Sequence, residues 1–165
     1  MVTRRSLLGS VAAMAVLPQL VWAEDYVDLD WDDLFPKDAP RIPNAVRSLA
    51  RHDETSDLFG QQPASSGVRT DWNGQVVRLP GFIVPIEFVD TRVSAFILVP
   101  YVGACVHVPP PPANQLVFVT TPEPYESKGL YEAVNVIGMF GTASVTTQLA
   151  QVGYALSADQ ILPFG

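Results

Sequence analysis

Cysteine and histidine are almost missing from this sequence of 165 residues, which contains one cysteine, Cys105, and two histidines, His52 and His107. A single cysteine excludes an internal disulfide, so its thiol must be buried, bound to a metal, chemically active or paired between chains. Basic residues are also scarce, because 10 Lys and Arg stand against 17 Asp and Glu. Such an acidic chain repels nucleic acid, so nucleic-acid binding is a poor hypothesis, whereas a cation or a basic protein partner is compatible with it.

The N-terminus has the pattern of an export signal. Arg4 and Arg5 precede an apolar stretch from Leu7 to Leu20, and small residues occupy the positions that determine cleavage after Ala23. This stretch falls short of the ~20 apolar residues that cross a bilayer, so we expect cleavage and no membrane span in the mature chain. The letters TRRSLL resemble a twin-arginine signal, with an ordinary Sec signal as the alternative. Either route predicts a periplasmic protein.

Removal of residues 1–23 leaves 142 of the 165 residues, which suits a single domain, with 8 basic and 17 acidic residues and a net charge of −9. We expect residues 24–72 to form an acidic arm, a short helix and a loop. The arm places apolar residues among aspartates, which predicts that it packs its aromatic side chains into a groove and leaves its acids in water. The alternative is a flap that attracts cations or a partner. The helix is predicted over 44–53, with His52 near its end.

Residues 73–165 are predicted to form the β-barrel domain. Asn73-Gly74 is a strong turn signal, and the alternating run after it predicts a long strand bent at Pro80-Gly81. Further strands are predicted over 93–99, 116–121, 134–140 and 152–157, with a loop at 122–124 and a short terminus at 158–162. The fold class that we expect is therefore mainly β, an OB-like antiparallel β-barrel with an acidic N-terminal arm and one short helix.

The most unusual stretch lies between the second and third predicted strands. Cys105 and His107 are two residues apart, so in extended backbone both side chains project to the same side. A stiff proline arm follows, and then Asn114 and Gln115, whose amides are placed to bond the carbonyl groups of that arm or to orient the His107 ring. The prolines of this Cys-His-Pro box (residues 103–115) are Pro109, Pro110, Pro111 and Pro112.

Three interpretations of Cys105 and His107 remain open from the residues. A thiolate and an imidazole suit zinc or copper, with His52 as a third ligand, although a closed structural site needs four. The pair also suits a thiolate nucleophile, for which no orienting residue or resolving cysteine is present. In the third interpretation Cys105 is a small buried residue and the box is a rigid structural or docking element.

The box, together with the stretches 31–36, 79–85 and 96–101, resembles a family of exported bacterial proteins classed as a domain of unknown function. The resemblance runs from about Tyr26 to the C-terminus. It implies a setting beside envelope ABC transporters and zinc-limitation responses, and it carries Cys105 and His107 over as the residues of interest. The leading hypothesis is therefore a periplasmic accessory protein, not an enzyme, that binds zinc through these two residues and acts with an ABC transporter component. A docking module that uses the proline-rich box is the alternative, and a thiol-dependent enzyme is a weaker one.

Overall fold

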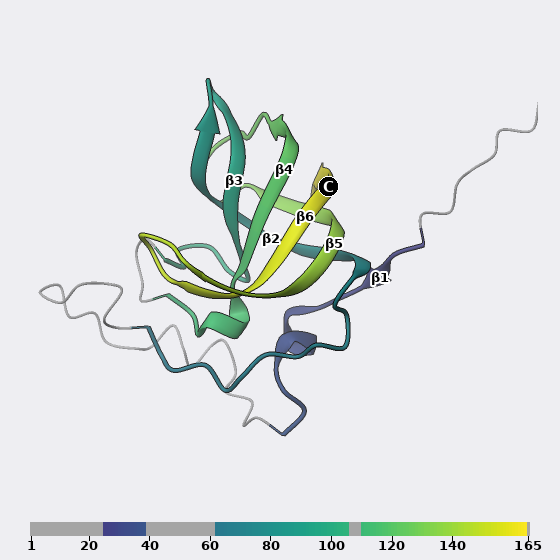
Figure 1. The fold of residues 1–165 in the computed structure, drawn as a ribbon. Helices are drawn as coiled ribbons and strands as arrows, with labels where there is room; N and C mark the ends of the chain where they lie inside the picture. The colour runs from purple at the N-terminus through teal and green to yellow at the C-terminus, as the bar shows by residue number, and fades with distance from the viewer. Residues whose placement is uncertain (1–24, 39–61, 106–109, 165) are drawn as a thin grey trace, which may run out of the picture.

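The computed structural model describes residues 25–38, 62–105 and 110–164 (Figure 1). The predicted helix over 44–53, both histidines, Pro109 and the export signal lie outside these residues. The elements in chain order are β1 (Val27–Asp28), the 3-10 helix η1 (Trp31–Leu34), β2 (Gln75–Val89), β3 (Arg92–Val99), the 3-10 helix η3 (Ala113–Gln115), β4 (Val117–Tyr125), β5 (Ala133–Thr146) and β6 (Gln151–Pro163).

Five strands close into a barrel in the order β2-β3-β4-β6-β5, and β5 pairs back onto β2. This confirms the mainly β, OB-like barrel. One strand pairing differs from the expected antiparallel barrel, because β4 and β6 are parallel. The other four pairings of the barrel are antiparallel. The reason is geometric: strand directions cannot alternate all the way around a closed ring of five, so one pairing must be parallel.

The bend predicted at Pro80-Gly81 lets β2 serve two sides of the barrel. Residues 75–82 of β2 pair with β5, and residues 82–89 pair with β3. Gly81 is needed at the crossing point, since a Cβ there would lie 2.7 Å from the Leu98 side chain. The predicted loop at 122–124 and the short terminus at 158–162 were wrong, because β4 continues to Tyr125 and β6 to Pro163. Pairing along β5 holds this last stretch of β6 in the sheet.

The barrel interior and a second apolar cluster outside it form the core. The interior cluster contains side chains from every barrel strand and from the arm. The second cluster lies on the outer face of β2 and β3, where it is covered by the Cys-His-Pro box and by the hairpin of β5 and β6. Its buried members are Val84, Ile97, Val99, Ala104, Cys105, Leu116, Ala150 and Val152.

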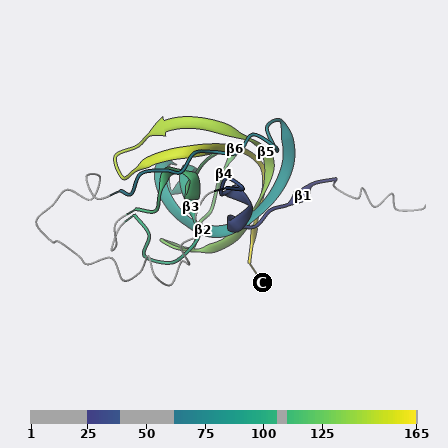
Figure 2. The same cartoon turned by 90° about the horizontal axis from the view of Figure 1, so that it is seen from below.

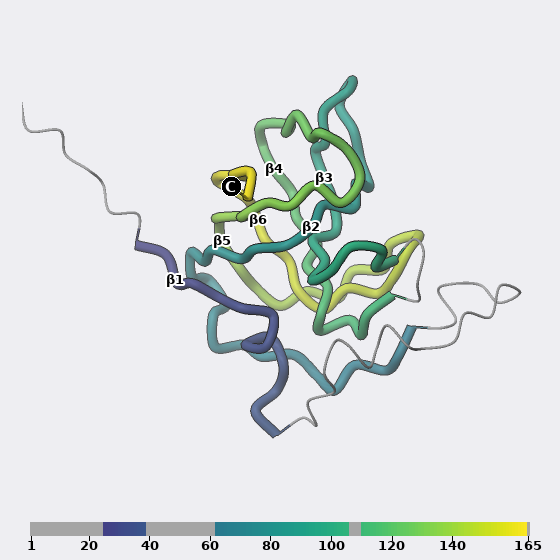
Figure 3. The backbone as a smooth tube through the Cα atoms, turned by 180° about the vertical axis from the view of Figure 1, so that it is seen from behind, coloured from purple at the N-terminus to yellow at the C-terminus, as the bar shows by residue number. Residues whose placement is uncertain are grey.

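The acidic arm (residues 25–38) lies across one end of the barrel, where η1 is seen within the ring of strands (Figure 2). Leu29, Trp31 and Leu34 belong to the interior cluster, and Phe35 is also buried. Asp28, Asp30 and Asp32 are exposed, and Asp33 is half-buried. The structure thus confirms that the arm packs its apolar side chains and leaves most of its acids in water. Figure 3 shows the arm and residues 62–72 at the same end of the barrel.

Candidate functional site

The Cys-His-Pro box begins in a turn and not in a strand. Gly103 has a φ of 93° and Cys105 a φ of 68°, which places both in the left-handed region. We expected extended backbone at Cys105, which would project its side chain on the same side as that of His107. This expectation was wrong, because the backbone at Cys105 is left-handed. Left-handed backbone is strained for a residue with a Cβ, and Tyr131, with a φ of 61°, shares it nearby. The two strained segments meet where the Tyr131 hydroxyl donates to the Ala104 carbonyl at 2.9 Å.

Cys105 is fully buried in the second apolar cluster. Burial raises the pKa of its thiol to about 12, because the thiolate would lose its hydration there. A nucleophilic cysteine needs a shift in the opposite direction, so this environment argues against thiol catalysis at neutral pH. It agrees with the interpretation of Cys105 as a small buried residue.

The proline arm is part of the fold rather than a free docking segment. Pro110, Pro111 and Pro112 are buried. The amide of Gln62 donates to the Pro111 carbonyl at 2.8 Å and also pairs with Gln151, whose N–H donates to Gln62 Oε1 and whose carbonyl accepts from Nε2, both at 2.8 Å. Gln62 therefore joins the proline arm to the edge of β6.

Asn114 and Gln115 are fully buried. Their side-chain amides bond other groups than the carbonyls of Pro110, Pro111 and Pro112, which corrects one of the two predicted partners, and the other, His107, lies outside the described residues. Asn114 donates to the Ser66 hydroxyl at 3.0 Å and to the Gly67 carbonyl at 2.8 Å. Gln115 donates to the Trp31 carbonyl at 3.0 Å. The reason is position, since η3 lies at the end of the barrel where the N-terminal arm and the loop before β2 converge. Both amides thus attach distant segments to the barrel.

The described residues alone do not form a metal centre. Within residues 25–38, 62–105 and 110–164, no group of three or more His, Cys, Asp and Glu side chains is placed to hold an ion. Cys105 is the soft ligand of this part of the chain, and its neighbours in the second cluster are apolar. A zinc site would need the histidines His107 and His52, which lie outside the described residues.

A groove that the sequence did not reveal lies between the two projecting hairpins. The β2–β3 hairpin and the β5–β6 hairpin diverge from the barrel (Figure 1), and the cavity between them measures about 490 Å³. Phe118 of β4 lines it, and apolar residues of both hairpins line its sides. The complete lining is Pro85, Ile86, Glu87, Phe118, Val145, Thr146, Thr147, Gln148 and Leu149. Sequence alternation identified the strands, but only their curvature brings these residues together.

The tip of the β2–β3 hairpin exposes two large apolar side chains. Phe88 and Val89 are 58% and 52% exposed. Side chains of this size on a projecting turn are typical of contact surfaces. Glu87 and Asp90 stand beside them, and no Lys or Arg lines the cavity. The groove therefore has a mixed lining, in which apolar residues stand beside Glu87, two threonines and Gln148.

Comparison with known proteins gives one family and one solved structure. The model of a family described as "Protein of unknown function (DUF3299)" matches residues 31–163. A crystal structure of a DUF3299 family protein from Pseudomonas aeruginosa PAO1 is 33% identical, with a TM-score of 0.72 over 85% of this chain and 97% of that chain. No curated protein gives a significant match. Among the described residues, no helix is long and apolar enough to span a membrane.

Proposed function

We propose, since this chain belongs to the DUF3299 family of proteins of unknown function, that it is a non-catalytic binding module that docks a protein partner in the groove between its two hairpins. The observation that carries the proposal is the groove itself, lined by Phe118 and by residues of both hairpins, with the exposed Phe88 and Val89 at the tip of one of these hairpins. In OB-fold proteins the corresponding barrel face and its flanking loops commonly bind ligands. The analogy with OB-folds indicates where a ligand would bind, and the lining side chains indicate which class of ligand fits there.

The charge of the site selects among ligand classes. Single-stranded nucleic acid, a frequent ligand of OB-folds, requires a positively charged track, whereas this groove has Glu87 and no basic lining residue. The whole chain has a net charge of −7. A protein segment that is apolar with basic flanks complements both features.

The Cys-His-Pro box has an internal role in this proposal. Pro110, Pro111 and Pro112 are buried, the Pro111 carbonyl is bonded to Gln62, and Cys105 packs under the β5–β6 hairpin that forms one side of the groove. The box therefore braces the hairpin and so sets the width of the groove. The setting that we propose is the periplasm, after twin-arginine or Sec export, with an envelope ABC transporter component as the partner. The predicted signal peptide and the family resemblance support this setting.

Site-specific photocrosslinking in the producing bacterium tests the docking groove. A photoreactive residue at Gln148, which lines the groove, should capture an envelope transporter component. The matched control places the same residue at Ser157, which is exposed on β6 outside the groove. A Glu87→Lys change should weaken the capture at Gln148, because it reverses the charge beside the site. Equal capture from both positions, or capture unaffected by Glu87→Lys, would refute the groove as the docking site.

Zinc binding through Cys105 and His107, with His52 as third ligand, is the second candidate function. The left-handed backbone at Cys105 favours it, because strained residues are concentrated at functional sites. The raised pKa of the Cys105 thiol opposes zinc binding, because the thiol must lose its proton to bind the metal and burial disfavours the thiolate. Zinc that binds the native state should raise the melting temperature of metal-free protein, and Cys105→Ser should abolish the rise. An unchanged melting temperature at saturating zinc would exclude this function.

A further inference from the structure

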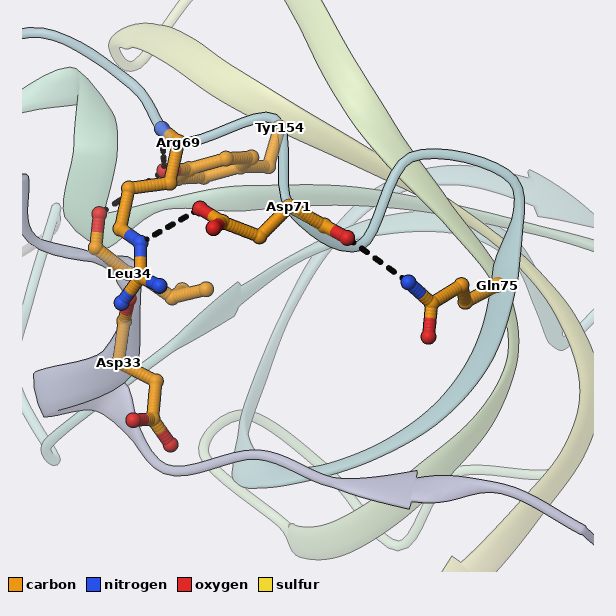
Figure 4. A network of polar contacts seen from close by, with 6 residues as sticks. All are labelled: Asp33, Leu34, Arg69, Asp71, Gln75 and Tyr154. Atoms are coloured by element: carbon orange, nitrogen blue, oxygen red, sulfur yellow. Dashed lines mark hydrogen bonds and ion pairs between the residues drawn. The ribbon is translucent and has the colours of Figure 1, made fainter.

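The acidic arm is bound to the end of the barrel in the manner of a peptide ligand. Side chains of the barrel and of the loop before β2 recognise its backbone at three carbonyl groups. The Tyr154 hydroxyl donates to Leu34 at 2.8 Å, and Arg69 Nη1 donates to Asp33 at 2.9 Å (Figure 4). Gln115 Nε2 donates to Trp31 at 3.0 Å. Carbonyl groups are present in every peptide, so these contacts recognise a backbone path and not a single side chain.

Side-chain anchors supply the specificity. Trp31, Leu34 and Leu29 enter the interior cluster, and the indole N–H of Trp31 donates to the Pro80 carbonyl at 2.7 Å. Before the 3-10 helix, β1 pairs with β2 in parallel, and the Leu29 N–H donates to the Arg78 carbonyl at 3.0 Å. Addition of a strand to a sheet edge, combined with apolar anchors in pockets, is an established way to bind a peptide.

One arginine pairs with an acidic side chain of the arm, and a second one contacts the backbone of the arm. Arg78 Nε lies 2.6 Å from Asp28 Oδ1, and its guanidinium lies 4.9 Å from the centre of the Tyr26 ring. Arg69 is held beside Asp71 at 2.8 Å and directs a second N–H to the arm. Arg78 therefore favours an acidic residue directly before the first anchor, Leu29.

A long stretch of chain separates the arm from the loop before β2 and from the barrel strands that bind the arm. The arm ends at Asp38, and 23 residues (39–61) precede Gln62, where the described chain resumes. We propose that this end of the barrel is a peptide-binding site for the pattern Leu-x-Trp-x-x-Leu-Phe. The arm fills it in cis and is exchangeable with the same segment of a second copy of the chain.

Exchange in a cut chain tests the proposal. A protease recognition sequence inserted within residues 39–61 allows the folded full-length protein to be cut after purification. A fluorescent synthetic peptide of residues 24–38 is then added, and its uptake is followed by anisotropy. The peptide should replace the arm at least about a hundredfold faster than the barrel unfolds globally, since partial openings are more populated than global ones. Exchange only at the rate of global unfolding would show that the arm is inseparable from the core, which overturns the proposal.

Two peptide variants identify what is recognised. Trp31→Ala removes the central anchor and the bond to Pro80, so it should weaken binding at least about tenfold. Asp32→Asn is the matched control, because this side chain is exposed, and its affinity should stay within about twofold. Equal affinity of the Trp31→Ala peptide would refute the assigned pattern.

A measurement on the uncut protein covers the case in which cutting unfolds it. The Leu29 N–H donates to the Arg78 carbonyl of β2, and this bond breaks when the arm leaves the barrel, so hydrogen exchange at Leu29 reports arm opening. It should exchange at least about a hundredfold faster than buried amides of β3. Equal protection of Leu29 and of β3 would show that the arm opens only with the whole barrel, and the proposal would then be wrong.

Discussion

The Tyr154 hydroxyl should be one of the most stabilising polar groups of this protein, and Tyr154→Phe tests this. The hydroxyl accepts from the Arg69 backbone N–H at 2.7 Å and donates to the Leu34 carbonyl at 2.8 Å. Phenylalanine keeps the stacking on Phe140, whose ring centre lies 5.1 Å away. The change therefore removes two hydrogen bonds and leaves the apolar packing in place.

The magnitude follows from what the substitution leaves behind. The Tyr154 side chain is fully buried, and the bond to Leu34 is buried as well. Each backbone group that loses its partner away from water costs about 1–3 kcal/mol. The Arg69 N–H is partly buried, so water can compensate some of its loss. We expect Tyr154→Phe to lower the free energy of unfolding by about 2–4 kcal/mol.

Urea unfolding monitored by tryptophan fluorescence measures the change. Trp31 in the arm and Trp72 in the loop before β2 both report on this end of the barrel. Tyr125→Phe is the matched control, because its hydroxyl bonds a carboxylate of Glu132 in a partly buried position where water can replace it. The control should lose less than about 1 kcal/mol. A loss below about 0.5 kcal/mol in Tyr154→Phe would refute the assignment of this hydroxyl as the link between arm and barrel.

The remaining predictions concern the box and its neighbours. Gly153→Ala should destabilise the protein by about 1–3 kcal/mol in thermal unfolding, because the new Cβ would lie 2.8 Å from a carbonyl of the box, whereas Gly141→Ala, with its nearest contact at 3.9 Å, should lose much less. Gln62→Ala should accelerate hydrogen exchange at the Gln151 amide, which loses its acceptor. Unchanged protection would contradict the role of Gln62 in joining the proline arm to β6. The unfolded thiol of Cys105 titrates near ~8.5 and the folded one near about 12, so the unfolded state releases its proton first and stability falls as pH rises between these values. Wild type should therefore lose about 1.4 kcal/mol per pH unit relative to Cys105→Ala in this window, and parallel profiles would refute the burial of the thiol.

Much of the fold could be predicted from local patterns. Alternation of apolar residues after Asn73-Gly74 predicted β2, and the apolar run of β3 was placed correctly. The ends of β4 and β6 were missed, because Pro122 to Pro124 and the residues after Ser157 contain turn formers that sheet pairing overrides. The burial of Trp31 and Leu34 also followed from the sequence, since apolar residues among acids favour one buried face.

The candidate site was less predictable, because its chemistry depends on contacts between distant segments. The composition singled out Cys105 as an unusual thiol, but its pKa is a property of its apolar neighbours from four other parts of the chain. Asn114 and Gln115 were predicted to bond the proline arm or to orient His107, yet Gly67 and Trp31, which accept from their side chains, lie 47 and 84 residues away. Nothing in the local sequence could identify these partners.

The sequence by itself determined the class of the fold and the acidic character of the chain, and it predicts an export signal, because these depend on composition and on patterns within a few residues. Only the tertiary structure decided which strands pair, where the parallel pairing lies and what covers Cys105. It also decided that Gln62 joins Pro111 to the edge of β6 and that the arm occupies the end of the barrel. The physical reason is that closure of a five-stranded barrel brings residues together by register and curvature, which no short stretch of sequence encodes.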